Sequence, residues 1–219
     1  MKLVLCSSGF FTPEIVAKTV ELVGKPQSEI SVAVINEAYV PTFRSHSWVA
    51  KELSRIDQHF GGRFELVNLL ALDGETIKER LQQHDIIYVL GGPTDYEMYT
   101  LQKSGFTNML PELLEAKVYV GSSAGSMILG KRIPTEVHTQ IFGRETDKVE
   151  TYGVTKYLGI VDMAIKPHMG SPKFPNCTPE NLKRLAPQID GPIYGIADDT
   201  AIIIDGDQVS IVGDNYIRI

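Results

Sequence analysis

The sequence of 219 residues has only two cysteines, Cys6 and Cys177. Two cysteines are too few for a disulfide framework, and their scarcity favours a reducing compartment. Cys6 lies in an apolar run and is expected to be a small buried hydrophobic residue, whereas Cys177 has no further ligand at a metal-like spacing. Since no other group of residues has the spacing of a metal site either, we expect no metal and no other cofactor.

Long hydrophobic runs are also missing. No window approaches the roughly 18 consecutive apolar residues that indicate a transmembrane helix. The apolar run at residues 1–6 ends at Ser7-Ser8-Gly9, which makes it too short for the core of a secretory signal. The sequence therefore predicts a cytoplasmic protein that does not bind a membrane.

An excess of positive charge is the third absence. The chain has 21 Lys and Arg against 27 Asp and Glu, with a formal net charge of −6. Without a block of Lys and Arg there is no footprint for phosphates, so nucleic acid is not expected as the main partner. A local basic pocket for an acidic substrate stays compatible with this balance.

Short apolar runs alternate with longer amphipathic ones over the first two-thirds of the chain, a pattern typical of α/β proteins. Because most of the expected strands are almost continuously apolar, they indicate a parallel sheet that is covered on both faces. The expected strands span residues 2–6, 30–35, 64–69, 86–90 and 118–120, and the expected helices span 13–24, 47–60, 74–83, 96–102 and 111–115.

Another strand is expected at 161–166 and a helix at 179–186, with Thr178 as its N-cap. The last strands are expected at 193–196, 201–205, 209–212 and 216–219, and the Asp-Gly step at Asp205-Gly206-Asp207 indicates a hairpin. The predicted fold class is α/β, a mostly parallel doubly wound sheet flanked by helices with an antiparallel C-terminal hairpin. No repeat or linker divides the chain, so residues 1–219 are expected to form one domain.

Four polar or glycine-rich clusters follow expected strands. In open α/β sheets, functional residues gather at the carboxyl ends of the strands. The convergence of the clusters at such ends predicts a site there. The clusters are Ser7-Ser8-Gly9, Gly91-Gly92-Pro93-Thr94, Gly121–Gly125 and Pro167-His168-Met169-Gly170.

The most informative cluster is Gly121-Ser122-Ser123-Ala124-Gly125, which lies between a β-prone run and a helix-compatible run. This layout predicts a nucleophile elbow, in which a serine on a sharp strand-to-helix turn exposes its hydroxyl above the sheet. Ser123 is then the candidate nucleophile, and the N–H of Ala124 points to where an oxyanion would form. The alternative is a turn that only caps a helix, with Ser122 or Ser123 as the N-cap.

A serine hydroxyl needs a base to take its proton. Of the five histidines, His168 directly follows an expected strand and should emerge at the same sheet edge as Ser123, so it is the candidate base. His138 is the reserve candidate, and an ordinary loop histidine is the alternative. Gly91-Gly92 can supply a second backbone donor for an oxyanion, or it can be a simple tight turn. It matches neither a phosphate loop nor a dinucleotide-binding fingerprint.

In their order along the chain, these motifs resemble the serine peptidase family of aspartyl dipeptidase (peptidase E) and cyanophycinase, which has the class I glutamine-amidotransferase-like fold. The resemblance spans nearly the whole sequence, from the Ser-Ser-Gly after the first strand to the segment Gly195–Ala201. It implies a single domain of this type over residues 1–219. It also implies metal-independent peptide hydrolysis through an acyl-enzyme, typically releasing an N-terminal acidic residue from a dipeptide.

Carried over by position, the resemblance makes Ser123 the nucleophile and His168 the base, with the N–H groups of Gly92 and Ala124 as oxyanion donors. It also suggests substrate contacts for Thr94, in the Gly-Gly-x-Thr segment, and for Asp198, which could hold a substrate amine. A turn aspartate that caps the last hairpin is the alternative for Asp198. The chain departs from the family at Pro93, where an Asn is usual, and it has no clear match after His168 for the arginine that reads aspartate. Two lysines could substitute for that arginine, Lys173 and Lys183.

The third member of the triad is expected between the nucleophile and the histidine. Glu136 is favoured because it follows the elbow at about the family's interval. The other candidates are Glu145, Asp147 and Asp162. Related amidotransferases place a glutamate two residues after the histidine, where this chain has Gly170.

The sequence thus predicts a serine peptidase for short peptides, with dipeptides that begin with aspartate as a candidate substrate class. An esterase or amidase with the same elbow and an inactive binding protein on the same scaffold are the alternatives. The polar segment 131–157 is expected to be a lid or specificity region, or else a surface loop. A homodimer is left open by the sequence.

Overall fold

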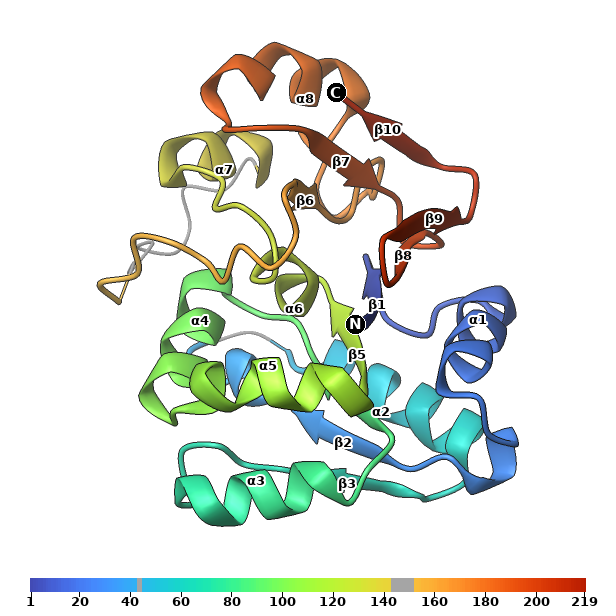
Figure 1. The fold of residues 1–219 in the computed structure, drawn as a ribbon. Helices are drawn as coiled ribbons and strands as arrows, with labels where there is room; N and C mark the ends of the chain where they lie inside the picture. Colours follow the sequence, from blue (N-terminus) through green and yellow to red (C-terminus); the bar gives the residue numbers. More distant parts are fainter. Residues whose placement is uncertain (43–44, 143–151) are drawn as a thin grey trace.

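The computed structural model describes residues 1–42, 45–142 and 152–219 (Figure 1). Within them, a seven-stranded sheet has the order β3-β2-β4-β5-β1-β8-β9. Neighbours from β3 to β1 are parallel, and β8 and β9 continue the sheet antiparallel. The strands are β1 (Lys2–Cys6), β2 (Val32–Ile35), β3 (Phe64–Leu66), β4 (Ile86–Val89), β5 (Val118–Ser122), β8 (Ala201–Asp205) and β9 (Gln208–Val212).

Helices cover both faces of this sheet (Figure 1). Alternate residues of a strand point to opposite faces, so Leu3 and Leu5 pack with α3, α4 and α5, whereas Val4 and Cys6 pack with α1 and α2. The predicted fold class, a mostly parallel sheet between helices with a C-terminal antiparallel hairpin, is confirmed. The helices are α1 (Pro13–Val23), α2 (Ser47–Phe60), α3 (Gly74–Gln82), α4 (Thr94–Lys103), α5 (Phe106–Ala116), α6 (Ala124–Met127), α7 (Thr135–Phe142) and α8 (Pro179–Leu185). Three short 3-10 helices are also present, η1 (Gln27–Glu29), η2 (Glu37–Tyr39) and η3 (Ala186–Gln188).

Local capping explains where several helices begin. The hydroxyl of Thr12 accepts a hydrogen bond from the N–H of Ile15, and Pro13 occupies the first turn, where its missing N–H costs nothing. The Thr178 hydroxyl caps α8 in the same way, as the sequence predicted. Pro111 was expected to open a helix, but it lies inside α5, which already begins at Phe106. Burial of Phe106 and Leu110 against the main core stabilises the additional turn.

A second, three-stranded sheet with the order β10-β7-β6 lies beside the carboxyl edge of the main sheet (Figure 1). The sequence analysis expected the last strands to extend the main sheet, but only the hairpin β8–β9 does so. The remaining strands bury a separate apolar cluster with α7 and α8, centred on Ile193, Leu182 and Val137. The strands of this sheet are β6 (Ala164–Lys166), β7 (Ile193–Ile196) and β10 (Tyr216–Arg218).

Within the described ranges, no helix combines the length and the apolar character that a membrane crossing requires.

Two buried carboxyl groups lie where α4 packs against η2. Glu97 is fully buried and Glu37 nearly so, and neither carboxyl oxygen of Glu97 has a hydrogen-bond partner among the described residues. Burial raises the pKa of Glu97 well above its ordinary value, and the nearby charge of Glu37 adds to this effect. Native Glu97 therefore keeps its proton at pH values where the unfolded chain has released it. The free energy of unfolding consequently falls as the pH rises above the ordinary glutamate range.

We expect Glu97→Met to stabilise the protein by about 1 kcal/mol at pH 8, because it replaces an unsatisfied buried carboxyl with an apolar side chain of similar size. The gain should shrink at pH 4, where Glu97 is protonated in both the native and the unfolded state. Urea denaturation at the two pH values measures both numbers. Glu79→Met on the exposed face of α3 is the control and should change little at either pH. An equal gain for Glu97→Met at both pH values would contradict the assignment.

Candidate active site

Ser123 lies at the sharp turn between β5 and α6, so the strand–turn–helix layout is present. Its backbone has φ 52° and ψ −109°, a conformation that is costly for a residue with a side chain. Three hydrogen bonds hold it: the N–H of Ser123 donates to the carbonyl of Cys6 in β1, and its own carbonyl accepts from Ser126 and Met127. Because both sides of the turn are fixed, the Ser123 hydroxyl is held at the carboxyl edge of the main sheet.

The glycine at position 125 is required by close packing of the turn. A Cβ at Gly125 would lie 2.9 Å from the carbonyl carbon of Val89 in the neighbouring strand, and still closer to its oxygen. The hydroxyl of Tyr119 donates to the Gly125 carbonyl at 2.7 Å. Backbone of α6 therefore packs directly on β4, and there is no room for a side chain.

His168 reaches Ser123 from the second sheet. It follows β6, has a positive φ of 66°, and its Nε2 lies 2.9 Å from the Ser123 Oγ. The imidazole also stacks on Phe174, with ring centroids 4.8 Å apart. The sequence analysis placed His168 at the same sheet edge as Ser123, but the two residues come from different sheets that meet there. His138, the reserve candidate, lies in α7, where burial and then the charges of Lys166 and Arg132 lower its pKa well below the ordinary range.

Asp198 completes a line of three side chains. It follows β7, and its Oδ1 accepts a hydrogen bond from His168 Nδ1 at 2.6 Å. Partial burial opposes ionisation, but hydrogen bonds from His168, Ser8 and Ser7 outweigh burial and hold the pKa of Asp198 well below its usual value. Asp198 is therefore a carboxylate at neutral pH. The serine, imidazole and carboxylate are in the geometry of a Ser-His-Asp triad.

The carboxylate that the sequence analysis favoured for this position is not the one found beside His168. Glu136 is exposed on α7, and Asp162 is exposed and forms an ion pair with Lys131 at 2.8 Å. Glu145 and Asp147 lie outside the described residues. Asp198, which was expected to hold a substrate amine, occupies the position predicted for Glu136. The end of β7 lies next to the end of β6 because these strands pair in parallel, and this pairing brings Asp198 to His168.

The two predicted oxyanion donors belong to segments that follow neighbouring strands. Ala124 is the first residue of α6, and Gly92 follows β4, the neighbour of β5. Among the described residues, neither backbone N–H donates a hydrogen bond to a backbone carbonyl. Gly92 has a φ of 152°, and a Cβ there would lie 2.6 Å from the Cβ of Ala38. Pro93, the departure from the family pattern, is the N-cap residue of α4.

Thr94 was expected to contact substrate. Its side chain is instead buried, with the hydroxyl 3.6 Å from the sulfur of Met127 in α6. Lys173 and Lys183, considered as readers of an acidic substrate, are exposed.

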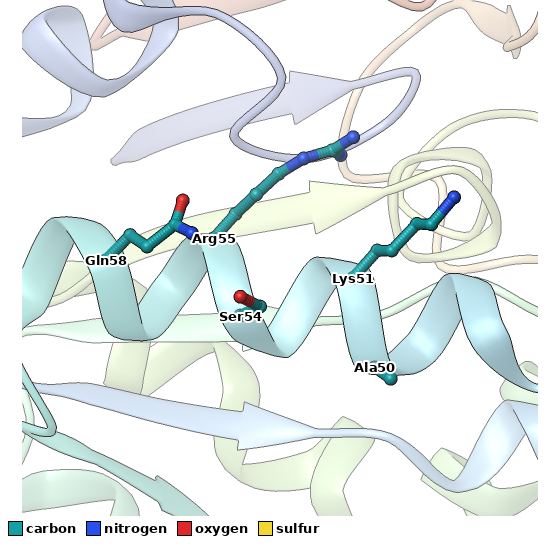
Figure 2. A pocket seen from close by; sticks show the side chains of 5 residues that line it. All are labelled: Ala50, Lys51, Ser54, Arg55 and Gln58. Carbon is teal, nitrogen blue, oxygen red and sulfur yellow. The ribbon is translucent and has the colours of Figure 1, made fainter.

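An open pocket of about 410 Å³ lies on the exposed face of α2. Figure 2 shows the side chains that line it. Arg55 connects this face with the site, because its Nη1 donates to the carbonyl of Ser8 at 3.2 Å while its guanidinium lies 4.8 Å from the ring centroid of Phe11. The triad residues do not line the pocket. Its lining residues are Ala50, Lys51, Ser54, Arg55 and Gln58.

Metal-ligating side chains do not gather here: among the described residues, no group of three or more His, Cys, Asp or Glu side chains could hold a metal ion.

Comparison with known proteins agrees with the geometry of the site. The model of peptidase family S51 matches residues 3–212, and the chain therefore belongs to this family. It is a serine-type peptidase.

Two relatives illustrate the similarity. An uncharacterized peptidase of Listeria monocytogenes is 29% identical over 148 residues, which are 66% of this chain and 69% of the relative. A protein of Shewanella sp. (strain ANA-3) named Peptidase E is 28% identical over 144 residues, covering 63% of this chain and 58% of the relative. The matched segments thus span between about three-fifths and two-thirds of the length of these two relatives.

Solved structures show the same fold. A candidate peptidase E protein from Listeria monocytogenes EGD-e superposes with a TM-score of 0.75 at 23% identity, covering 96% of this chain and 97% of that one. A peptidase from an acI-B1 Actinobacterium gives a TM-score of 0.64 at 20% identity, covering 100% of this chain and 93% of that one.

The close packing of the turn can be tested with two helical glycines. We expect Gly125→Ala to destabilise the protein by about 1–3 kcal/mol, because the added Cβ must displace the backbone of β4. Gly74→Ala in α3 is the matched control, since a Cβ there meets nothing within 4 Å. It should be neutral or slightly stabilising. Thermal unfolding followed by circular dichroism measures both, and equal melting temperatures for the two variants would contradict the packing argument.

Proposed function

We propose that this protein hydrolyses short peptides through an acyl-enzyme, with Ser123 as the nucleophile, His168 as the general base and Asp198 as the carboxylate that orients the imidazole. The observation that carries this proposal is the continuous line Ser123 Oγ–His168 Nε2, 2.9 Å, and His168 Nδ1–Asp198 Oδ1, 2.6 Å. Membership of a serine peptidase family gives the reaction class, and the line gives each side chain a role.

The tautomer of His168 follows from its partners. A carboxylate can only accept, so Nδ1 carries the hydrogen that is donated to Asp198. Nε2 then presents a lone pair to the hydroxyl of Ser123, which is the arrangement a general base needs. Asp198 also stabilises the imidazolium that forms when His168 takes the proton.

The chemistry then runs in two halves. Ser123 Oγ attacks the scissile carbonyl while its proton moves to Nε2, and the negative charge that develops on the carbonyl oxygen is stabilised by the N–H groups of Ala124 and Gly92. The C–N bond breaks as the leaving amine takes the proton from Nε2, which leaves an ester on Ser123. A water molecule then gives a proton to Nε2 and attacks this ester. The bond between the acyl carbon and Oγ breaks as Oγ takes the proton back from Nε2, which releases the acid and restores Ser123.

The substrate class in this proposal is short peptides, with dipeptides that begin with aspartate as the narrower candidate. The family resemblance and the relatives named Peptidase E support it. Asp198 now belongs to the triad, so the residue that recognises a substrate amine has to be another one. A panel that includes p-nitrophenyl esters and amides distinguishes a peptidase from an esterase with the same site.

The setting of the enzyme is also part of the proposal. We place it in the cytoplasm because its two cysteines are free and buried. Residues 1–219 act as one domain in this proposal, since the triad needs Ser123 from the main sheet and His168 and Asp198 from the second sheet.

Fluorophosphonate labelling read by intact-mass spectrometry tests the nucleophile. We expect one adduct on the wild type, none on Ser123→Ala, and strongly slowed labelling of His168→Ala, because only an activated serine reacts with this probe. Ser54→Ala, which removes an exposed serine on α2, is the control and should label like the wild type. The absence of an adduct on folded wild-type protein, or an adduct that persists on Ser123→Ala, would overturn the proposal.

Two carboxylate variants test the orienting role. We expect Asp198→Asn to lower kcat by about 10⁴, because the amide no longer fixes the tautomer of His168. Glu136→Gln should stay within about twofold of the wild type, as is usual for an exposed side chain away from the site. Steady-state kinetics on the best peptide of the panel give both values. The opposite ranking would return the role to Glu136.

A further inference from the structure

Two hydroxyl groups next to the triad have no role in the reaction as described so far. Ser7 and Ser8 directly follow β1, which pairs with β5 on one side and with β8 on the other. At the end of β1, Cys6 is opposite Ser122 and opposite Ala201. The segment after β1 is therefore next to both the nucleophile turn and the loop that carries Asp198.

Ser7 makes contacts to two members of the triad at once. Its Oγ accepts a hydrogen bond from the backbone N–H of His168 at 2.8 Å and donates to Asp198 Oδ1 at 3.0 Å. It is completely buried, and its own N–H donates to the carbonyl of Thr200. A single hydroxyl thus fixes the backbone of His168, which has an unfavourable positive φ, and the carboxylate that orients its ring.

Ser8 adds a second donor to the same oxygen. Its Oγ donates to Asp198 Oδ1 at 2.8 Å. The Ser8 carbonyl is in turn held by the guanidinium of Arg55 in α2. Asp198 Oδ1 therefore accepts from His168, Ser7 and Ser8 together, which restricts where the carboxylate can lie.

These contacts join the two sheets. Ser123 belongs to the main sheet, whereas His168 and Asp198 follow strands of the second sheet. One hydrogen bond, between Ser123 and His168, joins the sheets at the nucleophile turn. The hydroxyls of Ser7 and Ser8 add further hydrogen bonds between the segment after β1 and the His168–Asp198 pair. Without them, the backbone of His168 and the carboxylate of Asp198 would each lose a hydrogen bond to this segment.

We propose that Ser7 and Ser8 are positioning residues of this enzyme, whose hydroxyls hold the His168–Asp198 pair in register with Ser123. This inference rests on the proposed function, because it assigns a role within the same triad. Neither hydroxyl needs to touch the substrate. Their effect is on kcat rather than KM, since a displaced imidazole impairs proton transfer but not binding.

The charge of Asp198 is not what the two hydroxyls decide at neutral pH. Each hydroxyl that donates to the carboxylate stabilises its ionised form, and removal of one raises the pKa of Asp198 only toward the ordinary aspartate range. Asp198 therefore stays ionised above that range in every variant, and a loss of rate at neutral pH reports the position of the pair rather than its charge. Among the described residues, the charged or titratable groups near this pair include Glu52, Arg55, Lys166 and Cys177, and they are the same in the wild type and the variants.

The test uses the full chain and five proteins: wild type, Ser7→Ala, Ser8→Ala, Ser8→Thr and the surface control Ser54→Ala. The rate of labelling by a fluorophosphonate is measured from pH 4 to pH 9, because it needs no identified substrate, and kcat and KM follow on the best peptide. We expect Ser7→Ala to lose about 10- to 100-fold in labelling rate and in kcat with an unchanged KM. Ser8→Ala should lose less, and Ser8→Thr, which keeps the hydroxyl, should restore both the labelling rate and kcat.

The outcomes separate this inference from the proposed function. If the wild type labels at Ser123 and all four serine variants label at its rate with its pH profile, the inference is wrong and the triad stands. If the wild type does not label, the proposed function itself fails. Should Ser7→Ala not fold, the comparison of Ser8→Ala with Ser8→Thr decides, because Ser8 is partly exposed and the pair differs in the presence of the hydroxyl. Equal rates for that pair would overturn the inference.

Discussion

The structure depends on the junction between its two sheets, because the hydrogen bond between Ser123 and His168 crosses it. The main sheet fixes the serine through the backbone of the turn, and the second sheet delivers the imidazole and the carboxylate together from two paired strands. A triad built in this way needs the sheets to keep one relative position to within a fraction of an ångström. The buried cluster around Ile193 and Leu182 stabilises the second sheet, and the segment after β1 ties its loops to the first.

Strain and burial are concentrated at the same edge. Ser123 and His168 are two of the non-glycine residues with positive φ in the described chain, and they face each other across the junction. Such conformations persist only where the surroundings impose them. Near this edge, Glu52 is buried in contact with Ser122 and Tyr88. Burial raises its pKa, while hydrogen bonds from Ser122 and Tyr88 oppose the shift. The same edge of the sheet thus has an ionised Asp198 with several donors and a buried glutamate whose pKa is raised.

Much of the fold could be predicted from the sequence because its signals are local. Nearly continuous apolar runs marked the parallel strands, and Thr178 and the Asp-Gly step marked a cap and a hairpin. Ser123 and His168 were predicted because each follows a strand with a recognisable turn, and the structure brings their side chains within hydrogen-bonding distance. The sequence did not predict Asp198 as the carboxylate beside His168. That contact depends on the pairing of β6 with β7 and on the separation of the two sheets, and the spacing of residues along the chain indicates neither. The substrate contact expected for Thr94 differs from the structure for a related reason, because the packing of α4 against α6 buries its hydroxyl.

The position of β1 in the sheet also has a consequence for how the protein is made. This strand is the earliest in chain order, yet its two neighbours are β5, more than a hundred residues later, and β8, which follows Asp198. During synthesis, β1 would therefore leave the ribosome before either of its neighbouring strands exists. Long-range pairing of this kind slows folding and prolongs the exposure of unpaired strand edges. The last strand needed to enclose β1 is also the one directly after Asp198. The sheet around β1 and the contact between Asp198 and His168 can therefore form only after most of this sequence has been synthesised.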